Sequence, residues 1–206
     1  ETDTVLIDLL KPLREAQVPV HLVLGNHDHR ERFRAALPSD DAGEKAGLAE
    51  RHVMIVPTPR ANWFLLDSLD VTNKTPGVLG DAQRQWLAKA LDAHADKPAI
   101  VMVHHTPDER PMTPGLVDTP ALFETLLPRK HVKAIFFGHS HVWSVTQREG
   151  LHLVNLPPTA YVFDKKHPNG WVDATLAADG MRLRLHCLDK SHAANGQTHE
   201  LKWRAS

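Results

Sequence analysis

The sequence predicts an α/β domain built as a layered sandwich, and three observations support this. Short, almost continuous apolar runs, typical of buried parallel strands, occur at residues 18–24, 98–103 and 132–137. Segments with apolar residues at helical spacing lie between these runs. After residue 144 the pattern is one of strands without intervening helices. This order, α/β first and β-rich afterwards, is typical of sheets stacked in layers with helices.

The individual elements follow from the same patterns. Helices are expected at residues 4–16, 29–37, 81–95 and 119–127. Strands are expected in the α/β part at residues 18–24, 52–56, 62–66, 98–103 and 132–137. The β-rich part is expected to form a meander with strands at residues 144–147, 151–156, 171–176 and 181–188. A polar tail, residues 189–206, is expected to fray, which leaves residues 1–188 as the domain.

The composition excludes several classes of protein. A net charge of −1 and a pI near 7.1 lack the basic excess of a nucleic-acid-binding surface. No apolar run approaches the roughly 20 residues of a membrane span. The single cysteine, Cys187, excludes an internal disulfide, whereas 15 histidines supply nitrogen ligands suited to Mn, Fe or Zn. The oligomeric state and the compartment, cytoplasmic or periplasmic, stay open.

Polar motifs follow three of the expected buried strands. Gly25-Asn26-His27-Asp28 follows residues 18–24, His104-His105 follows residues 98–103, and Gly138-His139-Ser140-His141 follows residues 132–137. Open α/β sheets bind ligands at the carboxyl ends of their strands. The motifs therefore predict one common site.

The first motif combines a hard oxygen ligand with a candidate acid. Asn26 offers an amide oxygen to a divalent ion, and His27 beside Asp28 has the arrangement of an imidazole kept protonated by a carboxylate. An ordinary turn explains the string equally well, because Asn, Gly and Asp are the commonest turn residues.

The other two motifs supply imidazoles. His139 and His141 stand at i and i+2, which on an extended segment places both side chains on one side, facing one ion or two adjacent ions. A loop in a histidine-rich protein is the alternative. Of the His104-His105 pair we expect His104 to be the ligand, because adjacent strand residues point to opposite faces. We expect His105 to line the pocket, with a catalytic role as the alternative.

Together these motifs resemble those of the calcineurin-like metallophosphoesterase superfamily, whose later motifs read Gly-Asn-His-(Asp/Glu), a histidine loop and Gly-His-x-His. Leu66-Asp67-Ser68, the helix that follows Gly80, and Val103-His104-His105-Thr106-Pro107 look most similar to its cyclic-nucleotide phosphodiesterase branch, although a proline is common at the place of Thr106. The resemblance extends from Val5 to about Phe163 and implies an α/β/β/α sandwich.

The resemblance also implies roles for the residues. Asn26, His104 and His139 would bind the second of two metal ions, and His141 would bind the first. His27 would stabilise the transition state or protonate the leaving oxygen, with Asp28 holding its ring. The implied reaction is attack of a metal-bound hydroxide on the phosphorus of a small phosphoester, with a cyclic nucleotide as a candidate substrate.

The family's Asp-x-His and Gly-Asp motifs, which supply most ligands of the first ion, do not precede Val18. We therefore expect a fragment that lacks the first two βα units of the fold and holds one ion. Two other functions stay open. One is a phosphomonoesterase of the same superfamily, and the other is a non-catalytic binding or scaffold protein with an incomplete metal centre.

Overall fold

The computed structural model describes residues 2–37, 44–45, 48, 50–108 and 115–205. The helices are α1 (Thr2–Glu15), α2 (Arg30–Ala36), α3 (Asp81–Ala93) and α4 (Thr119–Leu126). The strands are β1 (Glu44–Lys45), β2 (Met54–Pro57), β3 (Asn62–Leu65), β4 (Ala99–Met102), β5 (Val132–Phe137), β6 (Ser144–Arg148), β7 (Leu151–Asn155), β8 (Gly170–Leu176), β9 (Gly180–Cys187) and β10 (Thr198–Lys202). Among the described residues, no helix has both the length and the apolar character needed to cross a bilayer.

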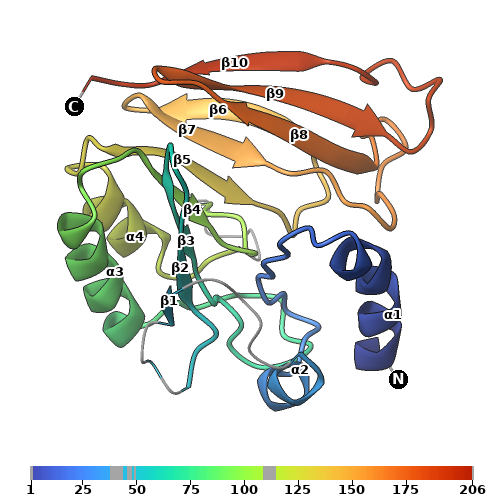
Figure 1. Cartoon of the computed structure of the whole chain (residues 1–206), viewed down its shortest axis with the longest axis horizontal. Coiled ribbons are helices and arrows are strands. Elements are labelled where there is room, and N and C mark those ends of the chain that lie inside the picture. The colour runs from blue at the N-terminus through green and yellow to red at the C-terminus, as the bar shows by residue number, and fades with distance from the viewer. Residues whose placement is uncertain (1, 38–43, 46–47, 49, 109–114, 206) are drawn as a thin grey trace.

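Two sheets are stacked face to face (Figure 1). The larger sheet has the strand order β1-β2-β3-β4-β5-β7-β6, and β3, β4, β5 and β7 run parallel. The smaller sheet is the antiparallel meander β10-β9-β8. The predicted α/β class, with a β-rich second part, is confirmed. The expected four-stranded meander is wrong, because β7 pairs with β5 and β6 within the larger sheet, and only β8 and β9 join the smaller sheet with β10.

The larger sheet is buried on both faces, which explains the continuous apolar runs of its parallel strands. On one face, Val101 and Ile135 pack with residues of α3 and α4 such as Leu87 and Leu122. On the other face, the sheet meets the meander through a second apolar cluster. Its buried members are Ala61, Ile100, Ala134, Phe136, Val154, Met181, Leu183 and Leu201. Helices, sheet and second sheet thus form successive layers.

Residues 18–24 form no strand, contrary to the prediction from their apolar pattern. The apolar side chains are used all the same: Leu24 is buried against Phe33 of α2, and Val23 packs beside Met54 and Leu65. A strand also needs a neighbouring backbone with which to form hydrogen bonds, and β2, not this segment, pairs with β3. The apolar pattern here reports the packing of Leu22, Val23 and Leu24 rather than strand pairing, and Val18 is 46% exposed.

The predicted frayed tail is also wrong for residues 198–202. They form β10, which pairs along its whole length with β9 and buries Leu201. Arg204 beyond it donates hydrogen bonds to the carbonyl oxygens of Leu126 and Val132. The tail therefore ties the second sheet to α4 and β5.

A buried ion pair holds α2 to the end of β3. The Asp67 carboxylate is fully buried and accepts hydrogen bonds from Arg30 Nε at 2.6 Å and from the backbone N–H groups of His52 and Leu69. Arg30 is the first residue of α2, directly after the Gly25–Asp28 motif. The pair thus fixes the position of that motif relative to the sheet.

We expect Asp67→Asn to lower the free energy of unfolding by about 3 kcal/mol. The substitution replaces a buried carboxylate paired with Arg30 by an amide, whose NH₂ group would face N–H donors that the carboxylate oxygen now accepts. Asp92→Asn is the matched control: its carboxylate pairs with Arg129 but is 61% exposed, so the loss should stay below about 1 kcal/mol. Urea denaturation measures both. Equal losses would contradict this account of Asp67.

Candidate metal centre

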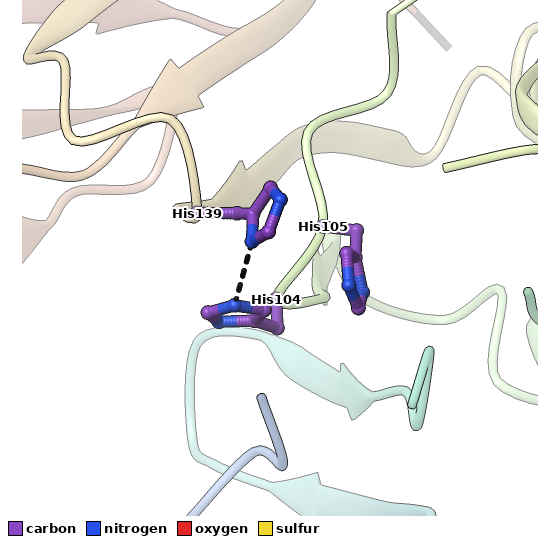
Figure 2. A group of neighbouring side chains, drawn as sticks. All are labelled: His104, His105 and His139. Atoms are coloured by element: carbon purple, nitrogen blue, oxygen red, sulfur yellow. Dashed lines mark hydrogen bonds between the residues drawn. The ribbon is translucent and has the colours of Figure 1, made fainter. Parts of the chain in front are cut away.

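The predicted site lies where the carboxyl ends of β4 and β5 meet. These strands are parallel neighbours, so His104 and His139, which follow them, arrive at the same edge of the sheet. Figure 2 shows the two imidazoles with His105 beside them. Asn26 reaches the same place from the loop before α2, and all three predicted ligands of the second ion are therefore brought together.

The ligand atoms converge at metal-binding distances. His104 Nε2 lies 3.1 Å from Asn26 Oδ1 and 3.2 Å from His139 Nδ1. Atoms bound to one ion by bonds of about 2.1 Å stand about 3.0–3.4 Å apart in octahedral or tetrahedral geometry. Two imidazole nitrogens and an amide oxygen suit Zn, Mn or Fe. The residues present therefore fit a divalent ion.

Burial keeps the central imidazoles neutral. It lowers the pKa of His104 to about 4, and the neighbouring His139 acts in the same direction. Burial likewise lowers the pKa of His105 to about 3. Only a neutral imidazole has a lone pair to give to a metal, so His104 is ready to bind an ion at neutral pH.

His105 does not line the pocket, contrary to expectation. It is fully buried behind His104, with Nδ1 2.8 Å from Ser68 Oγ. Its ring lies so close to Gly77 that a Cβ there would collide with it. His105 nevertheless stays close to the site, because its ligand atom lies within 4.8 Å of those of His104 and His139, and its Nε2 is buried with no hydrogen-bond partner among the described residues.

The second histidine motif is not extended. His139 and His141 have φ values of 69° and 57°, in the left-handed region that L-residues rarely occupy. The i, i+2 rule, which requires an extended backbone, therefore does not apply. His141 lines the same cavity but contacts Tyr161 and Phe163, and it is not part of the His104–His105–His139 cluster found among the described residues. Backbone strain of this kind concentrates at functional sites.

His27 has a hydrogen-bond partner that the sequence analysis did not predict. His27 Nδ1 lies 2.9 Å from Asn73 Oδ1, and because an amide oxygen only accepts, Nδ1 carries the hydrogen. Asp28 Oδ2 accepts the N–H of Gly25 at 2.7 Å and so closes the turn. Asn73 thus orients the His27 ring from its Nδ1 side.

Two further bonds dock the Asn73 loop onto the motif. Asn73 N–H donates to the carbonyl oxygen of Asn26, and Thr72 Oγ1 donates to that of Asp28. Sequence reasoning missed Asn73 because 46 residues separate it from His27. Its φ of 65° is a conformation that Asn tolerates, but a lone Asn in a loop does not predict a partner.

Comparison with known proteins places the chain in a family. The model of the calcineurin-like phosphoesterase family matches residues 1–143. The chain belongs to the calcineurin-like phosphoesterase family. This membership implies divalent metal ions, in agreement with the ligand cluster.

Curated relatives of this calcineurin-like phosphoesterase carry phosphodiesterase names. The chain is 34% identical, over 82% of its length, to the 3',5'-cyclic adenosine monophosphate phosphodiesterase CpdA of Pseudomonas aeruginosa, and covers 59% of that protein. It is 31% identical, over 70% of its length, to a probable cyclic nucleotide phosphodiesterase of a Synechococcus strain, covering 54% of it. The chain thus spans little more than half the length of these relatives.

A solved structure confirms the fold. A dimetal phosphatase from Danio rerio superposes with a TM-score of 0.77 at 17% identity, covering 98% of this chain and 78% of its own. At 17% identity the match supports the calcineurin-like fold alone.

Proposed function

We propose that this chain forms part of a metal-dependent phosphodiesterase that hydrolyses a small phosphoester, with a cyclic nucleotide as the candidate substrate. The observation that carries the proposal is the convergence of Asn26, His104 and His139 at metal-binding distances on a cavity that His27 also lines. The cyclic-nucleotide phosphodiesterase names of the curated relatives support the diester as substrate.

Asn26, His104 and His139 hold one ion in this proposal, and His141 is a ligand of the other. The Nδ1 atom of His141 is buried and has no hydrogen-bond partner among the described residues, as a side chain awaiting a ligand would be. Divalent ions at such a centre supply a nucleophile at neutral pH and neutralise charge on the phosphoryl oxygens. Mn, Fe and Zn all fit the donor set.

His27 is proposed to give a proton to the leaving oxygen from Nε2. Its Nδ1–H is directed to Asn73 Oδ1, which fixes the ring plane and leaves Nε2 as the atom that exchanges the proton. The ring is exposed on the cavity wall, where a substrate can reach it. Asp28 supports this geometry by closing the turn through the N–H of Gly25.

The test compares a diester with a monoester on the whole protein. With Mn²⁺ present, we expect bis(p-nitrophenyl) phosphate to be hydrolysed with a kcat/KM at least about 10-fold above that of p-nitrophenyl phosphate, about 1.4 kcal/mol of discrimination. A smaller ratio would favour a phosphomonoesterase. A protein that binds Mn²⁺ and hydrolyses neither ester would be a binding or scaffold protein.

Asn73→Gly tests the orienting hydrogen bond. Glycine keeps the left-handed backbone but removes the acceptor, so we expect kcat to fall about 10-fold while KM and metal content stay unchanged. Asn73→Asp retains an oxygen acceptor and serves as the matched control, with a smaller fall. Steady-state kinetics with metal analysis measures both. Identical kcat values for Asn73→Gly and the unaltered protein would contradict the role.

A further inference from the structure

The cavity at the metal centre is much larger than a phosphoryl group needs. Its volume is about 790 Å³, within the range of about 300–1,000 Å³ found for sites that hold whole small molecules. One wall carries the polar groups Asn26, His27, His104 and His139. Another part of the lining, here called the apolar wall, is mostly apolar and is formed by residues 156–161 and Phe163. Such a division suits a ligand with a charged end and an apolar end.

Two exposed aromatic rings end the apolar wall. Tyr161 is 55% exposed and Phe163 is 74% exposed, although rings of this size are normally packed away from water. The ring of Phe163 stacks on His141 with centroids 4.4 Å apart and planes at 19°. Tyr161 meets Phe163 edge-on at 5.5 Å and His141 at 4.7 Å. His141 thus supports one face of Phe163, and the high exposure leaves the rest of that ring open.

We propose that Tyr161 and Phe163 form a stacking platform for the base of a nucleotide whose phosphate lies at the metal centre. This inference rests on the proposed function and specifies the group attached to the phosphate. A planar base stacks on an aromatic ring, with a contribution to affinity of about 5- to 150-fold per base. His141 connects the metal centre with the platform, since it belongs to the Gly138–His141 motif and its ring contacts both Tyr161 and Phe163.

The single tyrosine of the sequence gives a direct probe, because Tyr161 alone reports in protein labelled with 3-fluorotyrosine. With Mn²⁺ replaced by diamagnetic Zn²⁺, we expect 5'-AMP and adenosine to shift the one ¹⁹F resonance of Tyr161, and ribose 5-phosphate to leave it nearly unchanged. Calorimetry should show AMP binding at least about 10-fold more tightly than ribose 5-phosphate.

Variants locate the effect. Phe163→Ala should weaken AMP binding about 10-fold and leave ribose 5-phosphate binding within twofold, and Phe163→Trp, which keeps a stacking ring, should restore AMP affinity. Trp171→Ala is the matched control, because Trp171 is an exposed ring stacked on His186 that does not line the cavity. It should change neither affinity.

Failure of the platform and failure of the metal centre give different results. Equal affinities for AMP and ribose 5-phosphate, both dependent on Zn²⁺, would overturn the platform and leave the metal-centre proposal intact. An adenosine-induced shift of the Tyr161 signal, together with ribose 5-phosphate binding that is independent of Zn²⁺, would support the platform and contradict the metal centre. The absence of any shift with AMP or adenosine would overturn the platform.

Discussion

His139→Ala is expected to weaken binding of a divalent ion by about 100-fold or more. His139 Nδ1 and His104 Nε2 lie 3.2 Å apart, so removal of one imidazole leaves His104 and Asn26 as the remaining ligands of that ion. Even outer-shell partners of metal ligands contribute about 10- to 100-fold to affinity, and a direct ligand contributes more. Competition of Mn²⁺ or Zn²⁺ with a chelating dye measures the affinity.

Substitutions of two other histidines serve as controls for this experiment. His186→Ala removes an imidazole of β9 that does not line the cavity, and it should leave the affinity unchanged. His141→Ala should leave the affinity of the site formed by Asn26, His104 and His139 nearly unchanged, because His141 does not belong to the cluster of His104 and His139. If His139→Ala bound the ion as tightly as the unaltered protein, the metal site would have to be sought elsewhere in the chain.

His27→Ala is expected to lower the turnover of the whole protein by about 10²- to 10⁴-fold, the usual contribution of a general acid. Metal content should not change, since the cluster uses Asn26 next to His27 and not the imidazole itself. Turnover of bis(p-nitrophenyl) phosphate, together with metal analysis of the same sample, measures both quantities. Loss of metal with little effect on turnover would show that His27 is a ligand and not an acid.

The two substitutions therefore separate metal binding from proton transfer. His139→Ala should lose the ion first and activity as a consequence, whereas His27→Ala should lose activity with the ion in place. The contrast follows from where each ring lies. His139 is in the cluster around His104, and His27 is hydrogen-bonded to Asn73 on the exposed wall of the same cavity.

Pattern alone predicted the parts of this molecule that depend on local chemistry. The apolar runs that form β4 and β5 are buried on both faces, and such runs can be recognised in a sequence without knowing which strands pair with them. The strands after residue 144 were equally readable, but their pairing was not: β6 and β7 belong to the larger sheet, and only β8, β9 and β10 form the meander. Pattern failed at residues 18–24 and 198–202, because strand pairing depends on a neighbour that the segment itself does not contain.

The placement of His104 and His139 at adjacent strand ends was also determined by the sequence, because parallel strands bring their carboxyl ends to one edge. The direction of each ring was not. His139 and His141 have a left-handed backbone, whereas the i, i+2 rule that places side chains on one side holds only for extended chain.

The sequence by itself thus determined the α/β class and the family, and it predicted the residues of the candidate metal centre, because strand period and short polar motifs are local properties of the chain. Only the tertiary structure decided that Asn73 orients His27, that His105 is buried against Ser68, and that Tyr161 and Phe163 stand beside His141. Asn73 and His105 each meet partners tens of residues away, and Tyr161 and Phe163 contact His141 from the segment that follows β7. Long-range contacts of this kind are fixed by packing of the whole chain, which is why they appear only in three dimensions.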